Sequence, residues 1–359
     1  MACCTSPYSN EHSRLQVVRW WTVAQCGGWL LGLGLLLTLW WQPTLGLHIF
    51  WDVLIPVAPA LVMLAPGLWR NICPLGTTSQ LGRRILTYRG GSLQPQWQAR
   101  MGLIGVLLLI TLVPLRHPWF NLSGTATLFL LLAAGITALL VGGLFSGKSG
   151  WCAGICPVHA VERLYGTRPI ATVTSGHCST CVRCTVPCPD TTPGIRHGQG
   201  HSTIARKSTR LLIIGGFPGF VLGWFQVQDG SPILEASTWL WPIGCMVISM
   251  VLWMLLQFVL PKTDSRKVDA IFATLAISSY YWFRIPALFG FGVFPGDGQL
   301  VNLNGVVPFE VFNIARIALV MFFVWWLIIR RPTPKPWMYK PPQVNTKSKP
   351  IVISIGLAP

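Results

Sequence analysis

Long apolar stretches constrain this chain more than any other feature of its sequence. Each of eight stretches is long enough, or nearly so, to cross a hydrocarbon layer of about 30 Å, which takes roughly 20 helical residues. Only 10% of the 359 residues are charged, whereas a soluble protein carries about 25%. We therefore expect an all-α integral membrane bundle of about eight transmembrane helices. The stretches are 17–41, 50–69, 101–115, 124–145, 210–228, 236–261, 268–289 and 307–329.

Basic residues are distributed unevenly between the two ends of these stretches. If the N-terminus is cytoplasmic, all lysines and arginines except Arg116, Arg284 and Arg316 fall on the cytoplasmic side. Cytoplasmic loops of membrane proteins collect such residues. The pattern predicts a multi-pass protein of the inner (cytoplasmic) membrane with both termini in the cytoplasm. It also accounts for the net charge of +17 without a nucleic-acid partner.

Four cysteines crowd into residues 178–188, CSTCVRCTVPC, and Pro189 follows them. The spacing C-x2-C-x2-C-x3-C-P is that of bacterial ferredoxins, in which the fourth cysteine ligates a second cluster. Zinc is the main alternative, but zinc sites favour two separated C-x2-C pairs. The run therefore predicts an iron-bound [4Fe–4S] cluster in a small cytoplasmic ferredoxin-like insertion. Its cysteines are Cys178, Cys181, Cys184 and Cys188.

Two further motifs place cysteines directly before proline, after the second and fourth stretches. They are RNICPLGT, with Cys73, and WCAGICP, with Cys152 and Cys156. Aligned, they form an internal pseudo-repeat of two spans followed by a cytoplasmic Cys-Pro, with Trp69 opposite Cys152. All seven of these cysteines fall on the predicted cytoplasmic side, where reducing conditions disfavour disulfides and favour metal or redox chemistry.

The number of cysteines limits the number of clusters, because two cubanes need eight ligands. One cluster takes Cys178, Cys181 and Cys184, with Cys188 or Cys156 as its fourth ligand. A second cluster would use Cys73, Cys152, Cys156 and Cys188, provided that the first uses none of them. Alternatively, His159 or His177 completes the set of eight.

These motifs resemble those of the membrane-bound polyferredoxins of the NapH/NosR type. The matching pieces are ICPLGTT (72–78), WCAGICP (151–157) and CSTCVRCTVPCP (178–189). The resemblance implies an integral membrane electron carrier, whose clusters exchange electrons with a quinone pool or a partner oxidoreductase. The chain departs from that family in having one full cysteine run instead of two, and in lacking a leading cysteine before Cys73.

The sequence carries no nucleophile–base pair, Walker loop or paired carboxylates, so an electron-transfer subunit is favoured over a stand-alone enzyme with catalytic residues. The expected partners are membrane lipid, a redox partner protein and a quinone, with no nucleic acid. A redox assembly or maturation factor for a respiratory metalloenzyme is the alternative function. No histidine lies within a span, so we predict no intramembrane haem.

Four segments organise the chain. Spans one to four occupy 1–145 with a cytoplasmic loop that carries Cys73, the iron–sulfur segment is 146–209, spans five to eight occupy 210–330, and a Pro/Lys-rich cytoplasmic tail covers 331–359.

Three charged residues in the last two spans leave two interpretations open. Arg284 and Arg316 lie at membrane depth, and Glu310 lies nearer the outer surface. They form either a quinone headgroup site or, as we favour, a structural ion pair between the spans. The segment 159–166, HAVERLYG, is amphipathic, which predicts a solvated or interfacial face starting at Glu162 and Arg163.

Overall fold

The computed structural model describes residues 11–85, 94–145, 150–166, 169, 203–260 and 265–330. Within these ranges every regular element is a helix and no strand occurs, which confirms the all-α expectation. The tail 331–359 and most of the iron–sulfur segment, including residues 178–188, lie outside the described residues.

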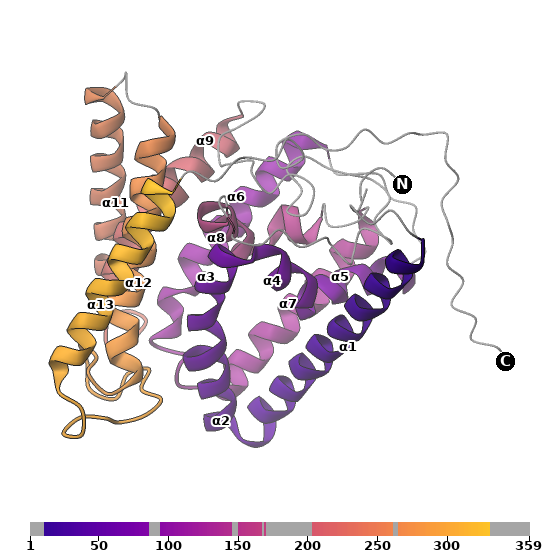
Figure 1. Ribbon diagram of the computed structural model, residues 1–359, viewed down its shortest axis with the longest axis horizontal. Helices are drawn as coiled ribbons and strands as arrows, with labels where there is room; N and C mark the ends of the chain where they lie inside the picture. Colours follow the sequence, from indigo (N-terminus) through magenta and orange to yellow (C-terminus); the bar gives the residue numbers. More distant parts are fainter. Residues whose placement is uncertain are drawn as a thin grey trace.

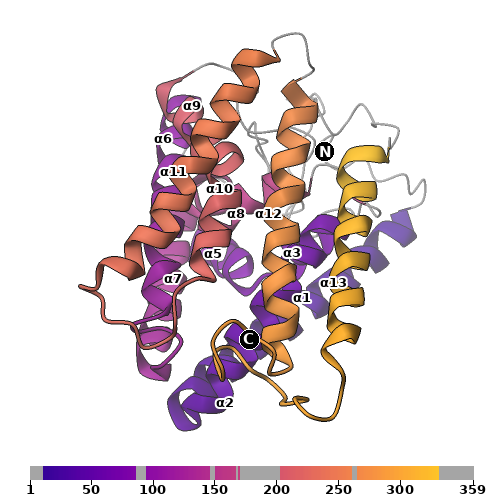
Figure 2. The same ribbon diagram turned by 90° about the vertical axis from the view of Figure 1, so that its left-hand side faces the viewer.

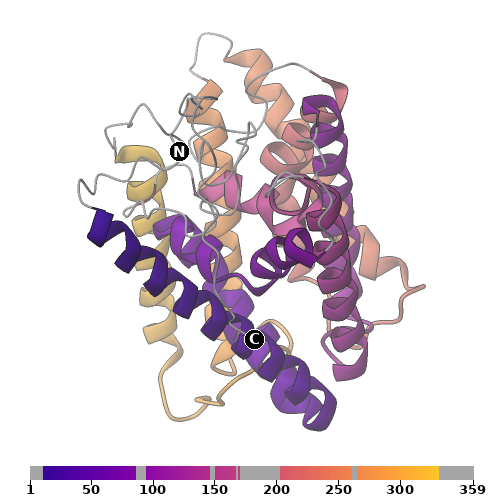
Figure 3. The same cartoon turned by 90° about the vertical axis from the view of Figure 1, so that its right-hand side faces the viewer.

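Two helix pairs form the N-terminal half of the molecule. The first helix, α1, runs diagonally across one side of the bundle (Figures 1 and 3). Short connecting helices follow the second member of each pair, and they carry the Cys-Pro motifs. The first pair and its connectors are α1 (Glu11–Trp41), α2 (Pro43–Leu47), η2 (His48–Leu54), α3 (Ile55–Leu64), α4 (Pro66–Ile72) and α5 (Pro74–Ile85). The second set is α6 (Pro95–Leu112), η3 (Pro114–Arg116), α7 (Gly124–Leu144), η5 (Trp151–Ile155) and α8 (Pro157–Tyr165).

The C-terminal half packs α11, α12 and α13 side by side at the opposite side of the molecule (Figures 1 and 2). A continuous helical stretch lies behind them and contributes much of the core. Its middle part is buried from Ile213 to Val221. The elements are α9 (Ile204–Arg210), η6 (Leu211–Gly216), α10 (Phe217–Trp224), α11 (Ala236–Val259), α12 (Ser265–Leu288), α13 (Phe309–Val324) and η7 (Trp325–Ile329).

Six helical stretches among the described residues are long and apolar enough to cross a membrane. Many of their large apolar side chains are exposed, which suits a lipid-facing surface. The other two expected spans are largely helical as well: η6 and α10 cover 211–224 of the stretch 210–228, and α12 runs to Leu288 in the stretch 268–289. The six are Trp20–Trp41, Pro43–Leu64, Gln96–Arg116, Gly124–Leu144, Ala236–Val259 and Phe309–Ile329.

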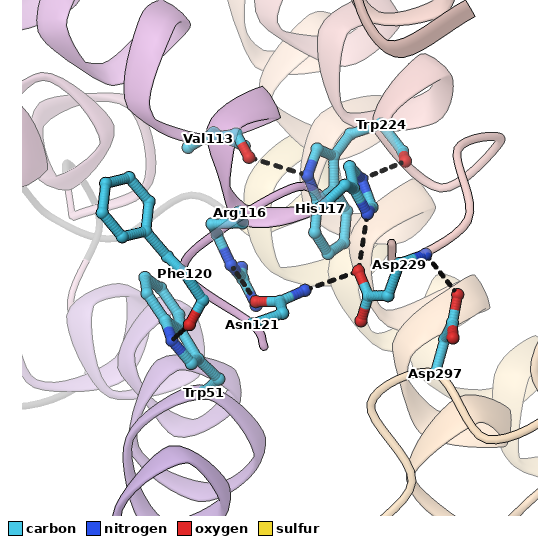
Figure 4. A network of polar contacts seen from close by, with 9 residues as sticks. All are labelled: Trp51, Val113, Arg116, His117, Phe120, Asn121, Trp224, Asp229 and Asp297. Atoms are coloured by element: carbon cyan, nitrogen blue, oxygen red, sulfur yellow. Dashed lines mark hydrogen bonds and ion pairs between the residues drawn. The ribbon is translucent and has the colours of Figure 1, made fainter. Parts of the chain in front are cut away.

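A polar network joins the two halves at the end of the bundle where α6 gives way to η3 (Figure 4). The Arg116 guanidinium lies over the Trp51 ring, 4.0 Å from its centroid, and over Trp224 at 4.7 Å. His117 Nδ1 is 2.7 Å from Asp229 Oδ1, and Asn121 donates to the same oxygen at 2.7 Å. Arg116, one of the three basic residues not expected on the cytoplasmic side, thus belongs to a polar network.

Arg284 has a different partner from the one expected. Its guanidinium donates to Asp52 Oδ1 at 2.5 Å and to the Trp51 carbonyl at 2.8 Å, and it is 4% exposed. Glu310 is exposed, and Arg316 contacts Asn313 instead. The expected ion pair between the last two spans is therefore wrong, and Arg284 instead forms an ion pair that joins α12 to η2.

Candidate functional site

The two Cys-Pro junctions have the same backbone geometry. Helix α4 ends at Ile72, Cys73 follows, and α5 begins at Pro74; η5 ends at Ile155, Cys156 follows, and α8 begins at Pro157. The φ and ψ angles are −59° and 119° at Cys73, and −59° and 117° at Cys156. A residue before proline avoids the helical region, and proline itself suits the first position of a new helix. The pseudo-repeat in the sequence is thus confirmed as a structural repeat.

Hydrogen bonding corrects the alignment of the two copies. The amide of Cys73 donates to the Trp69 carbonyl, four residues back, whereas that of Cys156 donates to Trp151, five residues back, both at 3.0 Å. The wider turn is the π-helix η5, and π turns accommodate one inserted residue, frequently at functional sites. Trp69 therefore corresponds to Trp151 by its hydrogen bond, and the second copy has one more residue between its tryptophan and its cysteine.

Each junction rests on a glycine in the first helix of its own pair. A Cβ at Gly28 of α1 would lie 2.4 Å from the Ile72 carbonyl oxygen, and one at Gly105 of α6 would lie 2.6 Å from that of Ile155. Both glycines fall inside the apolar stretches Trp20–Trp41 and Gln96–Arg116. Each junction therefore packs directly against an apolar stretch of the helix that precedes it.

The helix that follows each cysteine crosses to the other pair. Helix α5, after Cys73, packs mainly on α7, and α8, after Cys156, contacts α3 as well as α6 of its own pair; Figure 1 shows α5 beside α7. Each connecting helix therefore contacts the other helix pair.

Three of the predicted ligands meet at this point. The Cys73 Cβ and the Cys152 Sγ lie 3.7 Å and 3.9 Å from the position of a Cβ at Gly76. Burial, and then the charge of Cys73, raise the pKa of Cys156 to about 12. Thiols with such a pKa stay protonated in water, but bound iron supplies the positive charge that favours thiolates.

Among the described residues, no group of three or more His, Cys, Asp or Glu side chains is arranged to hold a metal ion. Cys73, Cys152 and Cys156 are thiols, the residue type that [4Fe–4S] clusters usually take as ligands.

A buried charge network lies beside the cysteines and links the two copies. Arg70 of α4 donates through Nε to Glu162 of α8, and His159 Nδ1 is 3.3 Å from the other oxygen of Glu162. Burial, the largest single influence, raises the pKa of Glu162, but Arg70 and His159 together outweigh it, so the pKa is lowered. Burial lowers the pKa of His159. Glu162 is only 5% exposed, so the prediction of a solvated face starting there is wrong.

The structure thus brings together only part of the predicted ligand set. Cys178, Cys181, Cys184, Cys188 and His177 lie outside the described residues. Sequence reasoning missed Gly28, Gly105 and the Arg70–Glu162 pair. The repeated Ile-Cys-Pro tripeptide was the one signal that could have directed attention to glycines at matching places in the preceding helices.

Comparison with known proteins adds nothing to this site. No family model matches the chain, and no curated protein or solved structure does. The family resemblance carried by the three cysteine motifs therefore remains an expectation, and function must be argued from the geometry of the site.

Proposed function

We propose that this chain is a membrane-bound iron–sulfur electron-transfer protein. The observation that carries the proposal is the meeting of two Cys-Pro junctions, from two structural repeats, at one place in a membrane bundle. Packing alone does not require cysteine at both junctions, since proline and the preceding residue's extended geometry are enough to break a helix. Thiolates gathered there are suited to soft metal centres.

The ligands divide between two clusters in this proposal. Cys73, Cys152 and Cys156 supply three thiolates to one cluster, and Cys188 supplies the fourth, because the last cysteine of a ferredoxin run ligates the other cluster. Cys178, Cys181 and Cys184 hold the second cluster, with His177 as the available fourth ligand. Each cluster, when bound, supplies one-electron chemistry.

Within this scheme the protein residues hold and tune the centre. The thiolates bind iron, and the Arg70–Glu162 pair fixes α4 against α8, so that the two halves of the ligand set keep their spacing. The junctions adjoin the apolar stretches of α1 and α6, so a lipid-soluble quinone is a suitable partner. A partner oxidoreductase completes the transfer.

The membrane arrangement is part of the proposal. Eight spans, with α10 and α12 added to the six clear candidates, leave both termini on the cytoplasmic side of the inner membrane, in keeping with the distribution of lysine and arginine. Cysteine-reactive labelling of intact cells tests the orientation, because a non-permeant reagent should label none of the seven motif cysteines from outside.

Anaerobic purification followed by counting iron and acid-labile sulfide tests the function. The expected result is eight irons and eight sulfides per chain, with an EPR signal on reduction. Four irons would leave one cluster and remove the proposed role of the Cys-Pro junctions. Zinc without sulfide would refute the electron-transfer function itself, and would leave a structural site.

A further inference from the structure

A buried histidine lies in the polar network that joins the two halves (Figure 4). His117 directly follows η3 in the N-terminal half, and it is 3% exposed. Its Nδ1 lies 2.7 Å from Asp229 Oδ1, and its Nε2 lies 3.1 Å from the Trp224 carbonyl oxygen. Trp224 ends α10, and Asp229 lies between α10 and α11. Both ring nitrogens of this one side chain therefore contact the C-terminal half.

Both partners of the ring are hydrogen-bond acceptors. The Trp224 carbonyl only accepts, so Nε2 must carry a hydrogen. The side-chain oxygen of Asn121 accepts from Arg116 Nε at 3.1 Å, which fixes the orientation of the Asn121 amide. The amide nitrogen therefore faces Asp229 and donates to Oδ1 at 2.7 Å. Since that oxygen also lies at hydrogen-bond distance from Nδ1 of the histidine, a proton is required between those two atoms.

The ring thus needs one proton more than a neutral histidine carries. An imidazole binds a proton more tightly than a carboxylate does, since their ordinary pKa values are about 6.5 and 3.9, so we place the proton on the ring. The surroundings suit a cation. His117 stacks on Trp224, with 4.7 Å between the ring centroids and 28° between the planes, and aromatic faces attract cations.

The charges around the pair balance when the histidine is protonated. Asp297, between α12 and α13, accepts from the backbone amide of Asp229 at 2.7 Å, and burial raises the pKa of Asp297. Three cations, two of them arginines, then face three carboxylates. Among the described residues, the other charged and titratable groups around His117 and Asp229 are Asp52, Arg116, Tyr280, Arg284 and Asp297.

We propose that His117 and Asp229 form a pH-sensitive bridge between the two halves of the protein. The protonated ring donates to Asp229 and to the end of α10. Loss of the proton leaves two lone pairs facing each other, one on Nδ1 and one on Oδ1, so this contact opens. A cavity of about 40 Å³ is lined by both side chains, against roughly 10–15 Å³ for one water, so water can enter between them. The bridge does not depend on the proposed electron-transfer function.

Thermal unfolding of the full-length protein in detergent, between pH 5.5 and pH 9, tests the bridge. A histidine that gains an anionic partner on folding stabilises the protein below its unfolded pKa, about 6.5, and that contribution is lost as the pH rises. The unchanged protein should therefore unfold at a higher temperature than the His117→Gln protein at pH 5.5, and this advantage should shrink towards pH 9.

His48→Gln is the matched control for that measurement. His48 also contacts an aspartate, since its Nδ1 lies 2.6 Å from Asp52 Oδ2, but its side chain is 46% exposed. The His48→Gln protein should keep the pH dependence of the unchanged protein.

The ring nitrogens report the proton directly. In protein that carries isotope-labelled histidine, nitrogen NMR at pH 7.5 should show both nitrogens of His117 protonated, whereas exposed histidines are mostly neutral at that pH. The signal is assigned by its absence from the His117→Gln spectrum. Asp229→Asn should return the ring to one protonated nitrogen, and this change assigns the signal if the His117→Gln protein does not fold.

Two results would overturn the proposal. One is a difference in unfolding midpoint between the unchanged and His117→Gln proteins that stays constant from pH 5.5 to pH 9. The other is a His117 ring with one unprotonated nitrogen in the folded, unchanged protein at pH 7.5.

Discussion

The carbonyl oxygen of Ile155 lies 2.6 Å from the point that a Cβ at Gly105 would occupy. Backbone contacts this close need glycine, and small residues allow such approach between membrane helices. The corresponding contact in the first copy joins Ile72 to Gly28 at 2.4 Å. Both cysteine junctions therefore depend on a glycine at the point of contact, Gly28 in α1 and Gly105 in α6, because a side chain there would clash with the junction backbone.

Gly105→Ala should displace the Cys156 junction and destabilise the protein by about 1–3 kcal/mol, the usual cost of overpacking. Thermal unfolding in detergent, with iron measured per chain, checks this. Gly135→Ala on α7 is the control, since a Cβ there meets nothing within 4 Å and alanine favours helix. Equal stability and equal iron in the two variants would show that the contact is not needed.

Cys152→Ser should remove one cluster and leave the other, so iron should fall from eight to four atoms per chain. The reason is that Cys152 lies at the junction of the two copies, whereas the other cluster draws on the run 178–188. Cys245→Ser on α11 provides the control, and it should keep the full iron content and the visible absorption. Iron that stays at eight in the Cys152→Ser protein would remove this residue from the ligand set.

Local features of the sequence were enough to locate the helices. The length of each apolar stretch predicted where a helix lies, and the Ile-Cys-Pro tripeptide marked both junctions. Both signals are local, because the hydropathy of a segment and the effect of proline on the backbone involve only neighbouring residues. The extra residue in the second copy was not recognised from the sequence. A π turn accommodates one additional residue while the helix continues, so the two copies align in the structure although their sequences differ in length by one residue.

Long-range pairs were not predictable in the same way. The partner of Arg284 is Asp52, and the partner of Arg70 is Glu162; in both cases the two residues are far apart in the chain. The packing of α4 against α8, and of α12 against η2, decides which charges meet. No local pattern in the sequence contains that packing, so the sequence suggested Glu310 as the partner of Arg284.

Acid should destabilise the protein through Glu162. Its pKa is lower in the folded protein than the ordinary value of 4.5, so the unfolded chain takes up a proton first as the pH falls. The stabilisation by Glu162 is then present above about pH 4.5 and is lost as the pH falls through the folded pKa. Unfolding midpoints of the unchanged protein and of Glu162→Gln, measured between pH 7 and pH 3, check this.

The Glu162→Gln protein should be less stable at pH 7, because the buried Arg70 loses its counter-charge, and breaking such a pair costs about 3–5 kcal/mol. It should also lose less stability on acidification than the unchanged protein does. Parallel pH curves for the two proteins would mean that other carboxylates account for the acid sensitivity.

Arg284→Gln should cost about 3–5 kcal/mol, since it leaves the buried Asp52 without its cation. Glu310→Gln should change stability by no more than about 0.5 kcal/mol, as exposed positions usually do. Thermal unfolding of both variants in the same detergent compares the pair seen in the structure with the one expected from the sequence. Should Glu310→Gln prove the more damaging change, the contact between α12 and η2 would not be what holds the two halves together.

The double variant Arg284→Gln, Asp52→Asn separates the effect of charge from that of packing. If the loss of stability in Arg284→Gln comes from the uncompensated Asp52 carboxylate, removing that carboxylate should recover part of the lost stability.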